Sequence, residues 1–432
     1  MPHQTLSRRT PAVDQGDTPP FYGWRIVKAS VVIAFVAWAF ALYGPSVYIS
    51  ALSIERGWPI GQLSSALTLS FLINALSIGI VGSLIGRHGS RVIMSVGAVI
   101  LGIGLILIGQ ITQAWQAFIV FPFMGLGWSC LSTIAISATI SPWFELQQGK
   151  AISTALLGAS LGGMFGVPIT LFLVTQLGLS LAMWVIGILA MMIIVPTAVT
   201  IMKRRPQDMG LLPDGLPDNI TDAATKVTHR NWSRAQALRT YGLLSVIVVF
   251  GTGLMVQVGF LSQQVKLLQF HMGTGGISIL VLAAGSLAFI GRVLLARIAD
   301  HINIRLASSA VLIMAAIGML VTGLANSVET IMMGVLIFGF NVGNLTTLPA
   351  LIVRREFGAN SFGRVFGITG TCMQLFSAFG PALFGLLYDY TQSYATPLLI
   401  AALLLALGAI LISLGQWRGP FLLKRGLSEK NP

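Results

Sequence analysis

ISILVLAAGSLAFIGRVLLARIAD, residues 277–300, is an apolar, helix-forming stretch with one charged side chain, Arg292, set deep inside it. Asp300 lies where the apolar run gives way to a polar turn. At roughly 1.5 Å per helical residue, Arg292 lies about 12 Å further in. The hydrocarbon half-thickness of a bilayer is about 15 Å, so this stretch predicts a membrane-spanning helix with an arginine near the middle of the membrane.

The arginine shares one face of this helix with small residues, while the opposite face carries large apolar ones. The small residues are Gly285, Ala288, Ala296 and Ala299, and the large ones are Leu287, Ile290 and Leu294. Small residues mark a helix-packing face, so the charge is expected to point into protein. An ionisable residue inside a membrane is by default a functional-site hypothesis. The alternative is a structural arginine that ties neighbouring carbonyl groups together.

Composition places the whole chain in a membrane. Of 432 residues, 55% are hydrophobic and only 9% are charged, against about 25% in a soluble domain. The net charge of +13 does not indicate a nucleic-acid partner, because all but three of the 26 Lys and Arg are expected at one surface. The three exceptions are Arg56, Lys266 and Arg292. This asymmetry is the positive-inside bias of a cytoplasmic face.

No feature of the chain indicates an enzyme. Cys130 and Cys372 both fall inside expected helices and form neither a disulfide framework nor a metal site. No nucleophile constellation, metal cluster or phosphate-binding loop is present, so no catalytic residue, metal or cofactor is expected. The N-terminal segment lacks the pattern of a signal peptide and is interpreted as a cytoplasmic tail.

The hydropathy pattern predicts an all-α membrane protein with twelve transmembrane helices. The expected spans are about 26–50, a second ending near 85, 92–111, 114–140, 149–177, 179–202, 241–268, 276–298, 305–326, 328–352, 361–388 and 393–417. They form an N-terminal six-helix bundle (26–202) and a C-terminal one (241–417), with cytoplasmic tails at 1–25 and 418–432. Residues 203–240 form a polar cytoplasmic linker with a short surface helix near its end.

The two halves repeat at an offset of 214 residues. GSLIGRHGSR (82–91) and ARIADHINIR (296–305) occupy the same turn after the second span of each half. At the same offset, Gly149-Lys150 falls on Gly363-Arg364 and Gly125 falls on Gly339. Three separate coincidences predict two pseudo-symmetric bundles built from parallel repeats.

Twelve spans in two repeats, a long central loop and the turn pattern G-x-L-A-D-R-x-G-R resemble the major facilitator superfamily. The first copy of the turn keeps Gly82, Leu84, Arg87, Gly89 and Arg91, with Gly86 where the pattern has aspartate; the second keeps Asp300 and Arg305, with Ala296 and Asn303 where the pattern has glycine. The resemblance implies a gating motif that latches the two halves together at the cytoplasmic side, weakened in the first copy by Gly86. Gly82, Gly86 and Gly89 are expected to break the helix there.

Within that superfamily the chain is similar to the monocarboxylate and oxalate-formate group. YGWRIV (22–27) leads the first span, GKAISTALLGASLGG (149–163) opens the fifth, and Arg292 precedes Asp300 by eight residues. The resemblance implies that Arg292 binds the carboxylate of a substrate.

The residues themselves favour an anion at Arg292. A guanidinium fork can bind both oxygens of a carboxylate, and every Asp or Glu is expected at a span end or in a loop. Further substrate-binding candidates are polar groups inside apolar spans, each of which could instead form an interhelical hydrogen bond: Tyr43, Tyr48, Trp128, Gln257, Asn341, Asn344 and Gln374. A glycine face on the fifth span (Gly158, Gly162, Gly163 and Gly166) is expected to pack between the two halves.

The sequence therefore predicts a monomeric secondary transporter in the inner (cytoplasmic) membrane that moves a small organic anion by alternating access. Its expected partners are the carboxylate and the lipid bilayer. Coupling is left open between a proton, carried by the substrate or a rim acid such as Asp389, and exchange for a second anion. The rival interpretations are an efflux transporter for drugs or metabolites and a membrane sensor or scaffold without transport.

Overall fold

The computed structural model describes residues 21–215 and 232–414, and these segments contain helices and loops but no strand. The first segment contains α1 (Gly23–Ala37), η1 (Trp38–Tyr43), α2 (Pro45–Arg56), α3 (Ile60–His88), α4 (Ser90–Ile108), α5 (Ala117–Ser129), α6 (Thr133–Ile140), α7 (Gln148–Ala155) and α8 (Leu157–Ile201). The second contains α9 (Arg234–Leu238), α10 (Tyr241–Gln269), α11 (Thr274–Ile298), η7 (Ala299–His301), α12 (Ile304–Gly323), α13 (Val328–Phe357), α14 (Ala359–Ala378), α15 (Gly380–Thr391) and α16 (Ala395–Leu414). The short helix expected near the end of the linker is α9.

The described residues contain 11 helical segments long and apolar enough to cross a membrane. One of them holds two crossings, because α8 runs for 45 residues with a break at Gly178, whose φ is 75° and ψ 162°. Two predicted spans, 149–177 and 179–202, meet at this glycine. The prediction of an all-helical protein with twelve crossings is therefore confirmed.

The first span is longer and less regular than predicted. It continues to Arg56, six residues beyond the expected end at Ser50, and its middle turn, η1, is a π-helix. The backbone N–H of Gly44 donates to the carbonyl of Ala39, and the hydroxyl of Tyr48 donates to the carbonyl of Phe40. Such single π-turns occur frequently at functional sites.

The prediction that Gly82, Gly86 and Gly89 break the helix is wrong for the first two. α3 continues through Gly82 and Gly86 to His88, and the chain turns only at Gly89, where φ is +85°. A glycine weakens a helix by about 1 kcal/mol relative to alanine. Inside a membrane that penalty is smaller than the several kcal/mol lost with an unsatisfied backbone hydrogen bond, so the helix persists.

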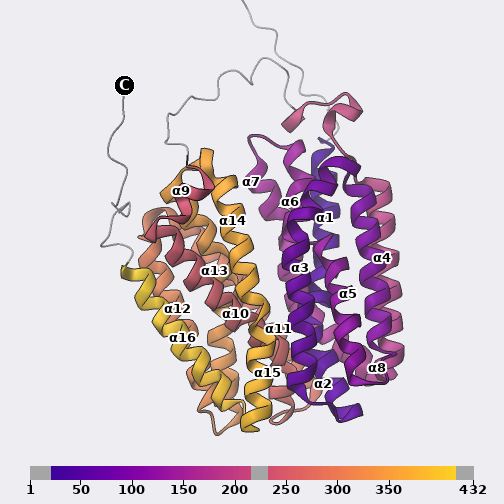
Figure 1. Cartoon of the computed structure of the whole chain (residues 1–432), viewed down its shortest axis with the longest axis vertical. Coiled ribbons are helices and arrows are strands. Elements are labelled where there is room, and N and C mark those ends of the chain that lie inside the picture. The colour runs from indigo at the N-terminus through magenta and orange to yellow at the C-terminus, as the bar shows by residue number, and fades with distance from the viewer. Residues whose placement is uncertain (1–20, 216–231, 415–432) are drawn as a thin grey trace, which may run out of the picture.

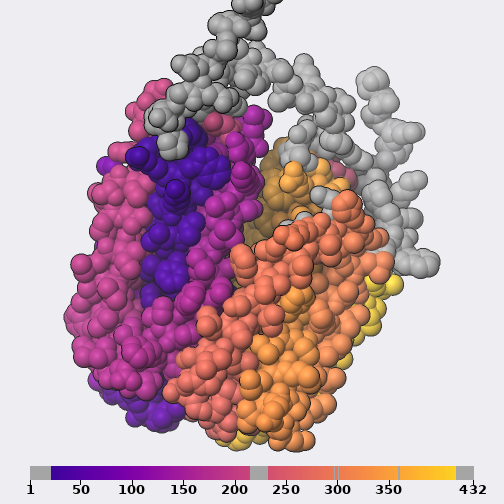
Figure 2. Space-filling view, turned by 180° about the vertical axis from the view of Figure 1, so that it is seen from behind, coloured from indigo at the N-terminus to yellow at the C-terminus, as the bar shows by residue number. Residues whose placement is uncertain are grey.

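The helices form two bundles side by side, α1–α8 and α10–α16 (Figure 1). We call the end that carries α7, α9 and the loop after α13 the linker end, because residues 203–240 join the bundles there. The other end, with the loops after Arg56, Gln269 and Thr391, is called the short-loop end. The bundles meet near the short-loop end and spread apart toward the linker end, where Figure 2 shows a hollow between them.

Four hydrogen bonds between the bundles lie near the short-loop end. Ser50 Oγ donates to Gln269 Oε1 (2.5 Å), Gly61 N to Asp389 Oδ2 (2.8 Å), Gln263 Nε2 to Ser64 Oγ (2.5 Å) and Ala382 N to Thr68 Oγ1 (3.0 Å). At the linker end, Arg204 donates to the carbonyl oxygen of Gly86 within its own bundle. The molecule is thus closed at the short-loop end and open at the linker end.

The glycine face of α8 does not pack where the sequence predicted. A Cβ at Gly158 would lie 2.0 Å from the carbonyl oxygen of Val31, and one at Gly162 or Gly166 would lie 2.8 Å or less from the backbone of Ala39. These glycines therefore pack on the first span within the N-terminal bundle. The contact with the other bundle is made by an adjacent face, where Met164 lies against Gly285 of α11.

Candidate functional site

Arg292 lies on α11, the helix that contacts both α8 of the first bundle and α13 of its own bundle. Glycines allow these close approaches: a Cβ at Gly343 would lie 2.5 Å from the carbonyl oxygen of Ala288 and 3.2 Å from the Cβ of Arg292. The opposite face of α11 is exposed, with Ile290 47% and Leu294 46% accessible. The predicted orientation of Arg292, toward protein and away from lipid, is confirmed.

The guanidinium of Arg292 is held by two hydroxyl groups from different bundles. Nη1 donates to Ser160 Oγ of α8 at 2.7 Å, and Nη2 donates to Thr346 Oγ1 of α13 at 3.1 Å. Its Nε is buried and has no hydrogen-bond partner among the described residues. Both partners are neutral hydroxyls, not the carbonyl groups expected of a purely structural arginine. The positive charge is therefore not cancelled by these partners, which use two of the five N–H groups, and the N–H of Nε is available for a ligand.

Tyr43 is the sequence-predicted candidate that the structure brings to Arg292. It is the last residue of the π-turn, and its phenol is close enough to interact electrostatically with the guanidinium. Its ring packs against Gly163 of α8, where a Cβ would lie 2.8 Å from the ring. Tyr48 does not join this group. It is fully buried, and its hydroxyl donates a hydrogen bond to the carbonyl oxygen of Phe40.

The amides of the C-terminal bundle divide between the site and the bundle interior. A Cβ at Gly291 would lie 3.3 Å from Asn344 Nδ2, so Asn344 lies beside α11 next to Arg292. Asn341 donates to the carbonyl of Ile337 on its own helix. The side-chain oxygens of Gln257, Asn341 and Asn344 are buried without a partner among the described residues. Gln374 is partly exposed on α14, and no contact links it to Arg292.

Trp128 lies in an aromatic cluster of the N-terminal bundle, edge-on to Trp38 and Phe71. Its indole N–H is buried without a partner among the described residues, as is the Nδ2 of Asn74 on α3. Sequence reasoning missed Asn74, although an amide inside an apolar helix was the signal that identified Asn341. It also missed Ser160 and Thr346, because isolated hydroxyl residues are common in membrane helices.

Arg305, at the end of the second repeated turn, forms its hydrogen bonds within the C-terminal bundle. Arg305 is buried and pairs with Glu356 through Nε–Oε1 (2.6 Å) and Nη2–Oε2 (2.9 Å). It also donates to Ser245 Oγ and to the carbonyl oxygens of Gly242 and Ile412, thereby joining α10, α12, α13 and α16.

Its counterpart Arg91 is exposed, as is Arg87, and a Cβ at Gly82 would meet only ordinary contacts. The side chain of Asp300 lies outside the described residues. The expected latch between the two halves therefore stays a prediction.

Comparison with known proteins agrees with this architecture. The family model described as Major Facilitator Superfamily matches residues 29–381. A solved bacterial homolog of the human lysosomal transporter Spinster superposes with a TM-score of 0.71 over 93% of this chain and 98% of its own, at 12% identity. At that identity the likeness shows the fold alone.

Three curated relatives are similar in sequence. The Monocarboxylate transporter 9 of Rattus norvegicus is 22% identical over 91% of this chain and 92% of its own length. The Aspyridones efflux protein apdF of Emericella nidulans is 23% identical over 88% of this chain and 75% of its own. The MFS-type transporter pynF of Aspergillus niger is 23% identical over 65% of this chain, and the chain spans only 61% of that protein.

Proposed function

This chain belongs to the Major Facilitator Superfamily, and on that premise we propose that it transports a small organic anion of the monocarboxylate type, with Arg292 binding the carboxylate. The family and its named relatives are transporters and not enzymes. Transport is thus the function shared across the family, and the proposal concerns the substrate and the residues that bind it.

The observation that carries the proposal is the set of partners around Arg292. Two hydroxyls hold its Nη atoms, while its Nε has no partner among the described residues. A desolvated cation favours an anion as ligand, and a guanidinium can donate to both oxygens of a carboxylate. Tyr43 lies near the guanidinium and Asn344 packs against α11 at Gly291, and we propose that they supply a phenol and an amide for the remainder of the solute.

Alternating access is supported by the position of Arg292 between the bundles. The hydrogen bond from Arg292 to Ser160 links α11 to α8, while the closing contacts lie nearer the short-loop end. We infer that the hollow at the linker end (Figure 2) gives access to the site from one side of the membrane only. We propose that the protein lies in the inner membrane with its linker end in the cytoplasm, because most Lys and Arg are expected at that end.

The same geometry supports two alternative modes of coupling, to protons or to a counter-anion. The side chains that contact Arg292 are hydroxyls, so a proton enters with the carboxylic acid or through Asp389, whose carboxylate joins the bundles by accepting the N–H of Gly61. Exchange of one anion for another needs neither route, because each anion in turn neutralises Arg292.

A second candidate substrate class is an amphipathic metabolite that the protein exports. It is favoured by the similarity to an aspyridones efflux protein over 88% of the chain and by the aromatic cluster of Trp38, Phe71 and Trp128. An exporter of neutral molecules would not need the charge of Arg292. The two candidates therefore differ in their response to one substitution.

The test is anion uptake into proteoliposomes containing wild-type protein, Arg292→Ala or Arg292→Lys, with Arg234→Ala as an exposed-arginine control. A panel of short monocarboxylates is offered with an inward proton gradient, and then with preloaded anion and no gradient. We expect Arg292→Ala to abolish uptake, Arg292→Lys to retain a small part of it, and the control to match wild type. Undiminished carboxylate uptake by Arg292→Ala would rule out the assigned role.

A further inference from the structure

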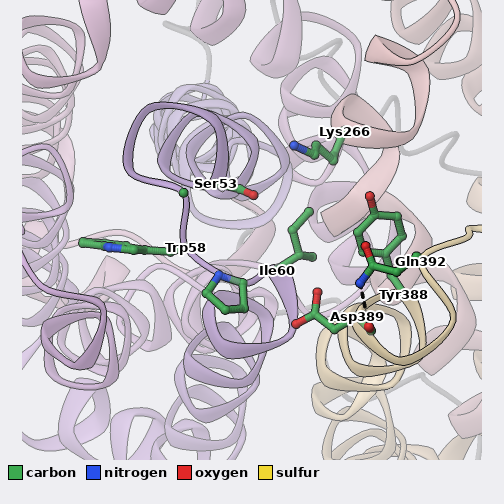
Figure 3. Close-up of a pocket in the computed structure, with 9 residues that line it drawn as sticks. Ser53, Trp58, Ile60, Lys266, Tyr388, Asp389 and Gln392 are labelled. Atoms are coloured by element: carbon green, nitrogen blue, oxygen red, sulfur yellow. Dashed lines mark hydrogen bonds between the residues drawn. The ribbon is translucent and has the colours of Figure 1, made fainter.

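A second pocket lies at the short-loop end, on the far side of the closing contacts from the hollow. It has a volume of about 520 Å³ and is walled by both bundles. The N-terminal bundle contributes Trp58 from the turn between α2 and α3 and Ile60 from the start of α3. The C-terminal bundle contributes Lys266, Tyr388 and Asp389 (Figure 3). The pocket thus combines apolar, aromatic and charged side chains.

Three layers of hydrogen bonds separate this pocket from Arg292. Along α3, Gly61, Ser64 and Thr68 lie progressively further from the short-loop end, and each is bonded to the other bundle. The hydroxyl of Tyr394 supports the middle layer by donating to Gln263 Oε1. The pocket and Arg292 therefore lie on opposite sides of these hydrogen bonds.

The two charges in the pocket are not equivalent. One oxygen of Asp389 accepts the backbone N–H of Gly61 at 2.8 Å, at the start of the 29-residue helix α3. A helix N-terminus stabilises a negative charge, so the protein itself already stabilises this carboxylate. Lys266 instead has its ammonium 5.7 Å from the centre of the Phe270 ring, and it belongs to no ion pair among the described side chains.

We propose that this pocket is a second binding site, for an amphipathic organic carboxylate whose charged group pairs with Lys266. The indole of Trp58, the side chain of Ile60 and the ring of Tyr388 provide the apolar and aromatic surface for the remainder of the ligand. A molecule bound there contacts both bundles and so stabilises the form that is closed at the short-loop end. The proposal does not depend on what Arg292 binds.

The experiment measures protection of Lys266 from an amine-reactive, membrane-impermeant reagent, using full-length protein in nanodiscs and peptide mapping by mass spectrometry. The probes are benzoate, an aromatic carboxylate, and benzamide, its neutral analogue. We expect benzoate to lower the labelling of Lys266 severalfold and benzamide to have no effect. Labelling of Lys150, at the linker end, is the internal control and is expected to stay unchanged.

The same measurement in Arg292→Ala separates the two sites. Protection of Lys266 should persist in that variant even if it no longer transports anions, so failure of the transport proposal and failure of this one give different results. Equal protection by benzamide would overturn the proposal, as would loss of protection in Arg292→Ala.

The affinity for benzoate, measured by calorimetry, provides an independent test. It is compared between Arg292→Ala and the two double variants that add Lys266→Gln or Lys266→Arg. We expect Lys266→Gln to weaken binding at least tenfold and Lys266→Arg to preserve it within a fewfold. The thermal unfolding midpoint without ligand verifies that both variants fold. Unchanged affinity in Lys266→Gln would also overturn the proposal.

Discussion

Two hydroxyl partners leave Arg292 able to exchange one hydrogen bond for another as a solute binds or leaves. A carboxylate partner in the protein would compete with an anionic substrate, whereas Ser160 and Thr346 can release the guanidinium without leaving a charge unpaired. Thr346 also donates to the carbonyl oxygen of Gly343, which fixes the direction of its lone pairs. The site is therefore ordered by neutral groups around a single charge.

Ser160→Ala tests whether the hydrogen bond from Arg292 to Ser160 positions the guanidinium for substrate binding. A hydrogen bond to a charged group contributes about 1.5–3 kcal/mol, so we expect the half-saturation concentration of the transported anion to rise about tenfold or more. The measurement is the concentration dependence of initial uptake in proteoliposomes. Ser278→Ala, on the exposed first turn of α11, serves as control. An unchanged half-saturation concentration in Ser160→Ala would contradict this role.

Arg305→Met tests how much the ion pair between Arg305 and Glu356 stabilises the protein, and Arg91, the counterpart of Arg305 in the repeat, provides the comparison. Removing one partner of a buried pair destabilises a protein by about 3–5 kcal/mol, and the one-third exposure of the Glu356 side chain places this pair at the lower end. We expect a clear fall in the thermal unfolding midpoint for Arg305→Met and almost none for Arg91→Met, whose side chain is exposed. Equal midpoints for the two variants would show that the pair contributes no stability.

At the level of elements, the first span and α8 form one unit around Tyr43. The π-turn shifts the register of the first span just before Gly44, and the glycines of α8 allow the two backbones to approach closely. The sequence predicted the helices, but it could not predict the π-turn, because one inserted residue leaves the hydrophobic pattern almost unchanged. It likewise identified the glycine face without indicating which neighbour that face contacts.

Gly163→Ala tests whether this packing places Tyr43 at the site. The new Cβ would lie 2.8–3.1 Å from atoms of the Tyr43 phenol, so the phenol must shift from its present position near Arg292. We expect uptake to fall severalfold while the thermal unfolding midpoint changes little, since the ring can shift into the neighbouring hollow. Gly370→Ala, where no atom lies within 4 Å of the new Cβ, is the matched control. Equal uptake by both variants would exclude a role for the position of Tyr43.

At the scale of the molecule, the two bundles are joined near one end and separated at the other. The bonds at Ser50, Gly61, Ser64 and Thr68 must break if the short-loop end is to open. Each interhelical hydrogen bond in a membrane contributes only about 0.6 kcal/mol. Four such bonds close the end without preventing its opening.

Cross-linking tests this requirement. Ser50→Cys and Gln269→Cys, combined and joined by a short thiol-reactive cross-linker, should hold the short-loop end closed and stop uptake. Each single variant treated with the same reagent is the control, and reduction of a cleavable cross-linker should restore uptake. Continued uptake by the cross-linked double variant would show that this end need not open.

By itself, the sequence determined the class of the protein, its twelve crossings, its internal repeat and the orientation of Arg292 toward protein. These follow from hydropathy and helical geometry, which act locally along the chain and are enforced by the membrane. Only the tertiary structure decided which groups hold Arg292, since Ser160 and Thr346 are far from it in sequence. The tertiary structure also decided that Tyr43 and not Tyr48 reaches the arginine, and that the short-loop end is closed, because contacts between helices depend on rotations and tilts that no local pattern encodes.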